Sequence, residues 1–352
     1  MLPDLSEPED RRDPFCRYFG TCGGCTLQHF GPAAYDALKR GLVEDALRHA
    51  HVAAALNPML AAHGDGRRRA TLHARGKAVG YMQARSHDLL DIAACPILVP
   101  ALAQRAVTLT HPIAATVGDC DVAYTATDTG LDVAIRTERR FKAERLTLLA
   151  QRSGAARLSL NGEIVIETRP PAVRMGKALV EIPVASFLQA TAEAEAVLAR
   201  LVRDGVGPAK SVADLFCGMG PFTLRLAETA RIFAADADRP AIAALHKAVK
   251  HTQGLKPVTA AVRDLFREPL LPRELDAHDA VVFDPPRAGA EAQARELAKS
   301  KVRTVVAVSC EPRTFARDAA ILIAGGYRLE SVTPVDQFAW SMHVEVVGVF
   351  RR

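Results

Sequence analysis

The sequence lacks the features that would place this protein in or across a membrane. Its 352 residues contain no apolar run of transmembrane length, and the N-terminus is acidic, unlike a signal peptide. Internal repeats and low-complexity segments are also missing. Because the seven cysteines occur without a secretory signal, we expect reduced thiols or metal ligands in place of disulfides. These absences predict a cytoplasmic protein that does not bind membranes.

The sequence also has little excess of positive over negative charge. The 45 lysines and arginines only slightly outnumber the 40 aspartates and glutamates, which permits an anionic partner but does not require one. The densest basic segments are residues 67–77 and a group formed by Arg136, Arg139, Arg140 and Lys142. Each is a candidate contact for nucleic-acid phosphates, although basic runs this short are more often solvated surface.

The length of the chain predicts two domains, residues 1–184 and 185–352. In the first, residues 33–50 have helical periodicity, and this helix is free to pack on the second domain. From residue 67 to about 183, short strands alternate with turns, and Asn161-Gly162 is the strongest hairpin signal. A helix near residues 141–152 interrupts the strands. The pattern predicts an antiparallel α+β domain.

Three cysteines are crowded into a short stretch near the N-terminus. Cys16, Cys22 and Cys25 have the spacing C-x5-C-x2-C, and two glycines between them allow the loop to fold back. Cys95 is followed by a proline, as iron–sulfur ligands often are, and is the natural fourth ligand. The pattern favours a [4Fe–4S] cluster. A zinc ion is the second choice because two C-x2-C pairs are absent, and unligated thiols are the third.

Beyond Gln189 strands and helices alternate. We expect helices at residues 191–202 and 240–250, and strands at 211–216, 231–235, 257–262, 279–283 and 303–308. Repeated βα units predict a parallel sheet with helices on both faces, and two closing strands, 327–334 and 343–350, imply an antiparallel edge. That edge separates methyltransferase sheets from dinucleotide-binding ones. The predicted fold is therefore α/β, a Rossmann-like methyltransferase domain that follows the smaller α+β domain.

A glycine-containing turn follows the first of these strands. Gly218 and Gly220 let a ligand approach the backbone, but Thr223 stands where a dinucleotide fingerprint has its third glycine. A small cofactor such as S-adenosylmethionine therefore fits better than a pyrophosphate ligand. Asp236, at the tip of the second strand, is placed to accept hydrogen bonds from ribose hydroxyls, and Asp264, after the third, to contact an adenine. Taken singly, each could instead be a surface carboxylate.

Two further strand ends carry reactive groups. Cys310 follows a run of small β-formers and precedes Pro312, so we expect it at the carboxyl tip of a buried strand, where a helix N-terminus favours its thiolate. The alternative is a small buried hydrophobe, which we expect for Cys120 and Cys217. Asp284 closes another strand, and the two prolines after it stiffen the turn. Its carboxylate would face the methyl donor or an incoming base.

Together these motifs resemble those of a known family. Asp214-Leu-Phe-Cys-Gly-Met-Gly, Asp284-Pro-Pro-Arg-Ala-Gly, Ser309-Cys-Glu-Pro and His343-Val-Glu are similar to motifs of RNA uridine-C5 methyltransferases. The cysteine set is similar to that of the iron–sulfur branch that acts on bacterial 23S ribosomal RNA. The resemblance covers the chain from about residue 15 to its end. It implies that Cys310 is the nucleophile, that Glu345 is the base, and that Gln189 and Phe216 line the cofactor pocket.

The sequence also departs from that family. Glu311 replaces the usual asparagine after the nucleophile, Asp236 replaces glutamate, and Thr191 and Pro221 stand where asparagine is common. The N-terminal β-barrel RNA-binding module that is frequent in the family has no counterpart. These departures leave the RNA target open.

The residues suit this chemistry. A thiolate of Cys310 that adds at uracil C6 would place electron density on C5, which otherwise is a poor nucleophile. A base must then remove the C5 proton so that the thiol can leave. We expect Glu345, with His343 on the same face of the last strand, to be partly desolvated and to have a raised pKa. The alternative for Glu345 is a solvated carboxylate on an edge strand. The uridine must be extruded from stacked RNA to reach both groups.

Other functions remain open. A redox or radical protein would leave Cys310 and Glu345 without a purpose, and the C-x3-C-x2-C pattern of radical enzymes is absent. A non-catalytic RNA-binding assembly factor would keep the fold without the chemistry, and transfer RNA is an alternative substrate to ribosomal RNA. Because methyl transfer moves no net electrons, we expect the cysteine centre to be structural and to support the RNA-facing domain. We also expect a monomer.

Overall fold

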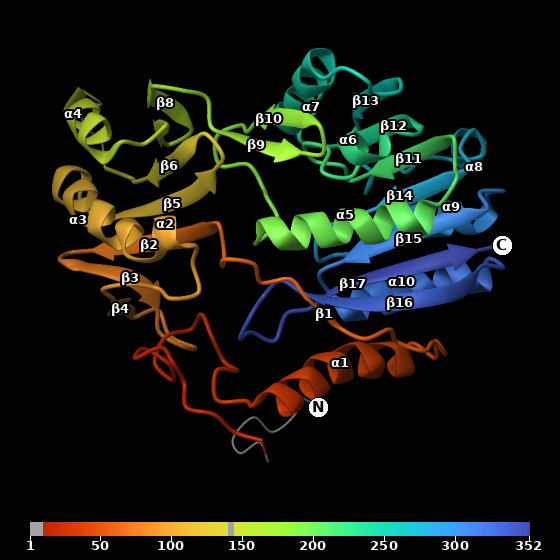
Figure 1. The fold of residues 1–352 in the computed structure, drawn as a ribbon, viewed down its shortest axis with the longest axis horizontal. Helices are drawn as coiled ribbons and strands as arrows, with labels where there is room; N and C mark the ends of the chain where they lie inside the picture. Colours follow the sequence, from red (N-terminus) through yellow and green to blue (C-terminus); the bar gives the residue numbers. More distant parts are fainter. Residues whose placement is uncertain (1–9, 140–143) are drawn as a thin grey trace.

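The structure is a computed structural model that describes residues 10–139 and 144–352. Figure 1 shows two sheets side by side and a long N-terminal helix, α1, beneath the larger sheet. Within the described residues, no helix is both long enough and apolar enough to span a bilayer. The predicted phosphate contacts at Arg140 and Lys142 lie outside those residues.

The larger sheet, called the large sheet below, has eight strands in the described part of the chain, in the order β1-β16-β17-β15-β14-β11-β12-β13. β17 is antiparallel to its neighbours β15 and β16, and the other pairs are parallel. This order confirms the predicted Rossmann-like methyltransferase sheet with an antiparallel final strand. The strands are β1 (Leu60–Ala61), β11 (Ser211–Leu215), β12 (Arg231–Asp236), β13 (Val258–Val262), β14 (Ala280–Phe283), β15 (Thr304–Ser309), β16 (Arg328–Asp336) and β17 (Glu345–Arg351).

Helices cover both faces of the large sheet. One face packs on α5 (Ala192–Val206), α6 (Thr223–Leu226), α7 (Arg239–His251) and the hairpin β9 (Ala172–Met175)–β10 (Ala178–Glu181). The other packs on α1 (Pro32–His49), α8 (Pro272–Leu275), α9 (Glu291–Lys299) and α10 (Pro312–Ala324). Strands buried on both faces must be apolar throughout, which explains the unbroken run of small β-formers in β15. The predicted domain boundary at residue 185 stays a prediction.

The second sheet, called the small sheet below, has seven strands among the described residues, in the order β4-β3-β2-β5-β6-β7-β8. The turn between β7 and β8 is Asn161-Gly162, where both residues have positive φ (+49° and +93°), as the predicted two-residue hairpin requires. The strands are β2 (Arg69–Arg75), β3 (Ala78–Met82), β4 (Leu89–Asp91), β5 (Cys120–Thr127), β6 (Gly130–Arg136), β7 (Arg157–Leu160) and β8 (Glu163–Glu167).

Among the described residues, three helices accompany the small sheet: α2 (Pro100–Ala103), α3 (Arg105–Val117) and α4 (Glu144–Ser153). α3 was not predicted, because residues 67–183 were interpreted as short strands with a helix only near residues 141–152. The α3 segment is rich in β-branched residues and contains Pro112, which disfavour a helix locally. Its buried residues Ala106, Thr110, Ile113 and Val117 nevertheless have helical spacing. Burial of that apolar stripe against the sheet therefore outweighs local propensity. Phe141, in the predicted start of α4, lies outside the described residues.

Candidate active site

One edge of the large sheet carries most of the residues that the sequence singled out. The carboxyl ends of its parallel strands meet there, and β17, which runs in the opposite direction, begins there with Glu345. The residues at or just after the parallel strand ends are Phe216, Gly218, Asp236, Asp264, Asp284 and Cys310. The fold therefore gathers residues that are more than 100 positions apart in the sequence.

The pairing of β15 with β17 places Cys310 beside Glu345. The two strands are antiparallel with Ser309 opposite Val346, so the next position along each strand brings the thiol and the carboxyl group together. Cys310 is partly exposed, whereas Glu345 retains only 3% exposure. His343 was expected on the same strand face as Glu345, and this is wrong because β17 starts only at Glu345.

Burial raises the pKa of the Cys310 thiol to about 11, and the carboxylates of Glu345 and Asp284 act in the same direction. Any stabilisation of the thiolate by the helix N-terminus behind Cys310, which stays a prediction, is outweighed by burial and by the two carboxylates. The N-terminus of α10 is capped by the carboxylate of Glu311, which accepts from the Arg313 N–H. The free protein thus holds Cys310 as a thiol at neutral pH.

Burial also raises the pKa of Glu345 to about 7, and a hydrogen bond from Gln337 and the charge of Arg287 oppose the rise. This agrees with the expectation of a desolvated carboxyl group. The Gln337 amide nitrogen donates to Glu345 Oε1 at 2.6 Å. Glu345 Oε2 is buried and has no hydrogen-bond partner among the described residues. A carboxyl group with a near-neutral pKa and one free oxygen is suited to accept a proton.

Gln337, which we did not single out in the sequence, connects the other groups. Its amide nitrogen also donates to Gln189 Oε1 at 2.7 Å, and Gln189 Nε2 donates to Asp284 Oδ2 at 3.3 Å. Desolvation, reinforced by the charge of Glu345, raises the pKa of Asp284 well above its ordinary value. Gln337 follows directly after β16, which ends at the same sheet edge, so the rule that selected Asp284 could also have selected it.

The turn after β11 is open to a ligand. Phe216 and Gly218 have φ values of +60° and +51°, and no atom lies within 4 Å of a Cβ built on Gly218. Asp236 Oδ2 accepts from the Gly218 N–H at 2.8 Å and so holds the turn against β12. Asp264 accepts from the Phe266 N–H at 3.0 Å, and its side chain is 43% exposed. A half-buried backbone turn is therefore framed by carboxylates that follow two neighbouring strands.

Comparison with known proteins identifies the family. A family model described as tRNA (Uracil-5-)-methyltransferase matches residues 132–352. This chain belongs to the tRNA (uracil-5-)-methyltransferase family. It is therefore an RNA methyltransferase. An uncharacterised RNA methyltransferase from Brucella suis biovar 1 is 47% identical over 362 residues, which cover 100% of this chain and 87% of that protein.

Two further relatives bear functional names. The 23S rRNA (uracil(1939)-C(5))-methyltransferase RlmD of Chromohalobacter salexigens is 32% identical over 100% of this chain and 79% of its own length. The crystal structure of Pyrococcus abyssi tRNA (uracil-54, C5)-methyltransferase in complex with S-adenosyl-L-homocysteine matches with a TM-score of 0.74 and 21% identity. That match covers 93% of this chain and 85% of the archaeal one, and it shows a shared fold.

The predicted metal ligands of this methyltransferase lie around one cavity. Its volume is about 240 Å³, and the cysteines that line it are Cys16, Cys22, Cys25 and Cys95. The cysteine loop is tied to the small sheet, because the Gly23 N–H donates to Met82 O at 3.1 Å. Within residues 10–139 and 144–352, no group of three or more His, Cys, Asp or Glu side chains is placed to hold a metal ion.

Within the basic segment at residues 67–77, a candidate phosphate contact, Arg68 and Arg69 are bonded inside the protein, whereas Arg75 and Lys77 are exposed and stay candidates. Arg68 is buried, with Nη2 2.6 Å from Glu195 Oε2, and its Nε donates to Gln189 O at 3.1 Å. Arg69 donates to Leu188 O at 3.3 Å. These two arginines fix the backbone that carries Gln189, because burial forces each guanidinium to find internal acceptors.

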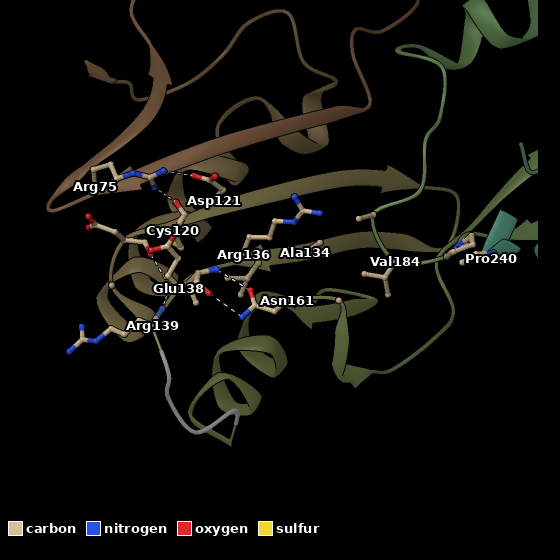
Figure 2. Close-up of a pocket in the computed structure, with 17 residues that line it drawn as sticks. Arg75, Cys120, Asp121, Ala134, Arg136, Glu138, Arg139, Asn161, Val184 and Pro240 are labelled. Atoms are coloured by element: carbon tan, nitrogen blue, oxygen red, sulfur yellow. Dashed lines mark hydrogen bonds and ion pairs between the residues drawn. The ribbon is translucent and has the colours of Figure 1, made fainter. Parts of the chain in front are cut away.

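A larger cavity, of about 1170 Å³, lies between the small sheet and the N-terminus of α7. Figure 2 shows Arg136 extending from β6 into this space, on the side toward Val184 and Pro240, and Arg139 also lines the cavity. Arg75 is paired with Asp121 at 2.8 Å. Arg136 and Arg139 are both exposed and stay candidate phosphate contacts at this site.

Proposed function

We propose that this chain methylates C5 of uridine in RNA with S-adenosylmethionine as the methyl donor, Cys310 as the covalent nucleophile and Glu345 as the base. The observation that carries the proposal is the strand register that sets the Cys310 thiol beside a buried carboxyl group with one free oxygen. Membership in a family of RNA uracil-5 methyltransferases supports the choice of substrate.

The open turn at Gly218 suits S-adenosylmethionine. Space in front of Gly218 admits a ligand against the backbone, and Asp236 is at the position where a carboxylate accepts from ribose hydroxyls. Phe216 and Phe266, whose ring centroids are 5.4 Å apart, offer an aromatic surface for an adenine, with Asp264 at its border. When bound, this cofactor supplies an electrophilic methyl group. Gln189 would line the cofactor pocket, and Asp284 would face the methyl donor or the incoming base at the same sheet edge.

In the proposed first step, Cys310 adds to uracil C6 as a thiolate. The thiol of Cys310 must therefore lose its proton before it adds. Because its pKa is about 11 in the free protein, the thiolate is scarce until a positive charge or a proton acceptor is present. Arg287 lowers that pKa and lies within hydrogen-bond distance of His343 (Nη2 to Nε2, 3.0 Å). Asp284, with its raised pKa, can donate a hydrogen bond to a uracil carbonyl and so accept part of the charge that develops on the ring.

Glu345 is to take the C5 proton after methylation, and the electron pair of that C–H bond then expels the Cys310 sulfur from C6. The unpartnered Oε2 is the acceptor, because Oε1 already accepts from Gln337. In a Glu345→Gln variant the first half of the reaction remains possible, but the proton has no acceptor. A methylated RNA joined covalently to Cys310 should therefore accumulate.

Ribosomal RNA, 23S in particular, is our proposed substrate. The support is the 32% identity to RlmD over the whole of this chain, together with the four cysteines around one cavity. Mass-spectrometric mapping of 5-methyluridine in RNA from cells with and without this protein tests it. We expect one 23S position to lose the mark. Loss only from transfer RNA would assign the other substrate, and an unchanged map in both fractions would refute the proposed function.

The four cysteines are proposed to hold a [4Fe–4S] cluster. The support is that all four cysteines line one cavity of about 240 Å³, and that their spacing lacks the two C-x2-C pairs typical of a zinc site. Anaerobically purified protein should contain about four irons and four sulfides per chain. Cys22→Ser should lose them, whereas Cys120→Ser, a change at a buried cysteine of the small sheet, should not.

A further inference from the structure

A lysine from the N-terminal helix is buried next to the final strand of the large sheet. Lys39, on α1, has 0% exposure, and its Nζ donates to Asp336 Oδ1 at 2.7 Å. It also donates to two carbonyl oxygens, Phe338 O at 3.1 Å and His343 O at 2.6 Å. An ammonium group has three donors, and here all three are used inside the protein.

These acceptors belong to the segment between β16 and β17, residues 336–345, which we call the return segment. It begins with Asp336-Gln337 and ends with Glu345, so it carries the amide that binds the proposed base and the base itself. Lys39 binds the return segment near both ends, at Asp336 and at His343, so one ammonium group holds the two ends together. A shift of the ammonium group would therefore move both ends at once.

The middle of the return segment is held by the N-terminal region too. Trp340 has φ of +64°, a conformation that side chains rarely adopt without support from their surroundings. Its N–H donates to the Tyr35 hydroxyl at 3.0 Å, and its carbonyl accepts from the N–H groups of Thr26 and Leu27 at 2.8 and 3.1 Å. The residues that support it lie just after the cysteine loop.

The charge of Lys39 is balanced by a carboxylate that is itself held by several donors. Burial would raise the pKa of Asp336, but hydrogen bonds from His63, Lys39 and Tyr35 and the charge of Lys39 hold it at about 2. Desolvation lowers the pKa of Lys39, and Asp336 opposes that change. Two buried charges are tolerated only with such dense pairing, and pairing of this kind specifies one arrangement of the segment.

We propose that Lys39 is a positioning residue for proton removal by Glu345, acting through the return segment. The inference rests on the proposed function and adds to it. α1 would then be a working part of the active site, although it lies about 300 residues from Glu345 in the sequence. Loss of the Lys39 ammonium group is expected to slow the release of methylated RNA more than the formation of the covalent adduct.

The test compares four variants with the parent protein. Each is incubated with S-adenosylmethionine and a transcript that carries the mapped uridine. Lys39→Met keeps the apolar stem and removes the ammonium group; Tyr35→Phe is a milder change at the same segment. Arg157→Met is the matched control, because Arg157 is an equally buried cation whose Nε lies 2.8 Å from Asp132 Oδ1 in the small sheet. Glu345→Gln defines full accumulation. Adduct is measured on denaturing gels, product release by turnover, and folding by thermal melts.

In Lys39→Met we expect product release to fall on the order of 10²-fold with accumulation of adduct, while RNA and cofactor affinities stay at the parent values. Tyr35→Phe should give a smaller accumulation, and Arg157→Met should melt earlier without accumulating adduct. Parent rates of release in folded Lys39→Met would overturn the proposal, as would an equal loss of both steps. Should Lys39→Met not fold, Tyr35→Phe decides in the same way. If Glu345→Gln itself forms no adduct, the proposed function fails instead.

Discussion

The two sheets of this molecule differ in how their faces are covered. In the large sheet, helices lie on both faces, and every residue of β14 and β15 is buried. In the small sheet, α3 and α4 lie on the outer side, away from the large sheet, as Figure 1 shows, and β8 has no buried residue. A sheet with helices on both faces must have a fixed register. A sheet with helices on one face leaves the other face for a ligand.

Register is what the proposed chemistry needs. A slip of one residue between β15 and β17 would turn Glu345 to the opposite face, away from Cys310. Continuous apolar strands with helices on both sides prevent such a slip, because it would expose buried valines. The small sheet has no comparable demand, and the cavity that contains Arg136 lies on its inner side, toward α7.

The largest predicted effect is the difference in turnover between alanine variants of two cysteines, one in each sheet. Cys310→Ala removes the proposed nucleophile of the large sheet and should lower turnover on the order of 10⁴-fold or more. Cys120→Ala removes a buried sulfur from the small sheet and should cost about 1 kcal/mol of stability while turnover per folded molecule stays unchanged. Both are measured by 5-methyluridine formation and thermal melts. Formation of 5-methyluridine by Cys310→Ala would refute the covalent scheme.

A substitution in the core of the small sheet should lower the free energy of unfolding without changing turnover. Arg157 and Asp132 form a bidentate pair, with both N···O distances 2.8 Å, and their side chains are 4% and 3% exposed. Arg157→Met leaves Asp132 buried without its cation, which costs about 3–5 kcal/mol. Denaturant titration measures this loss. Turnover per folded molecule should remain at the parent value, and a large drop would show that the sheets are coupled more tightly than their separate cores indicate.

The pH dependence of the two proposed steps should differ. Glu345 must be ionised to accept a proton, and its pKa is about 7, so adduct breakdown should fall about tenfold per pH unit below neutrality and level off above pH 8. Adduct formation depends on the Cys310 thiolate and should continue to rise above pH 8, because that pKa is about 11 in the free protein. Quenched-flow experiments with pH jumps separate the steps. Identical profiles would contradict the assigned roles.

Much of the large sheet could be predicted from the sequence because its pattern is local. Each βα unit contains its own strand, turn and helix, and the polar residue at a strand end marks the functional edge, as Asp236, Asp284 and Cys310 do. The antiparallel last strand followed from the missing helix before it. By contrast, α3 could not be recognised, because its helical state depends on burial against the small sheet and its β-branched residues favour strands locally.

The details of the site depend on contacts between distant segments, which no local pattern contains. The pKa of the Cys310 thiol is raised first by burial and then by Glu345 and Asp284, which only the sheet brings near. Gln337 gains its significance from two partners at opposite ends of the domain. Arg68 resembled a surface charge, because a run of three arginines is typical of solvent-exposed segments. Its ion-pair partner, Glu195, lies 127 residues further along the sequence. Such pairings became visible only in three dimensions.

The smallest predicted effect concerns the face that the small sheet leaves open. If Arg136 contacts one RNA phosphate in the cavity beside α7, Arg136→Gln should weaken RNA binding a few-fold and reduce the slope of log K against log salt by about 1. Arg231→Gln is the matched control, because Arg231 is an exposed arginine at the start of β12, at the edge of the large sheet opposite the carboxyl ends of the parallel strands. Filter binding at several salt concentrations measures both. Equal slopes for the two variants would place the RNA elsewhere, since a sheet face without a phosphate contact cannot contribute to counterion release.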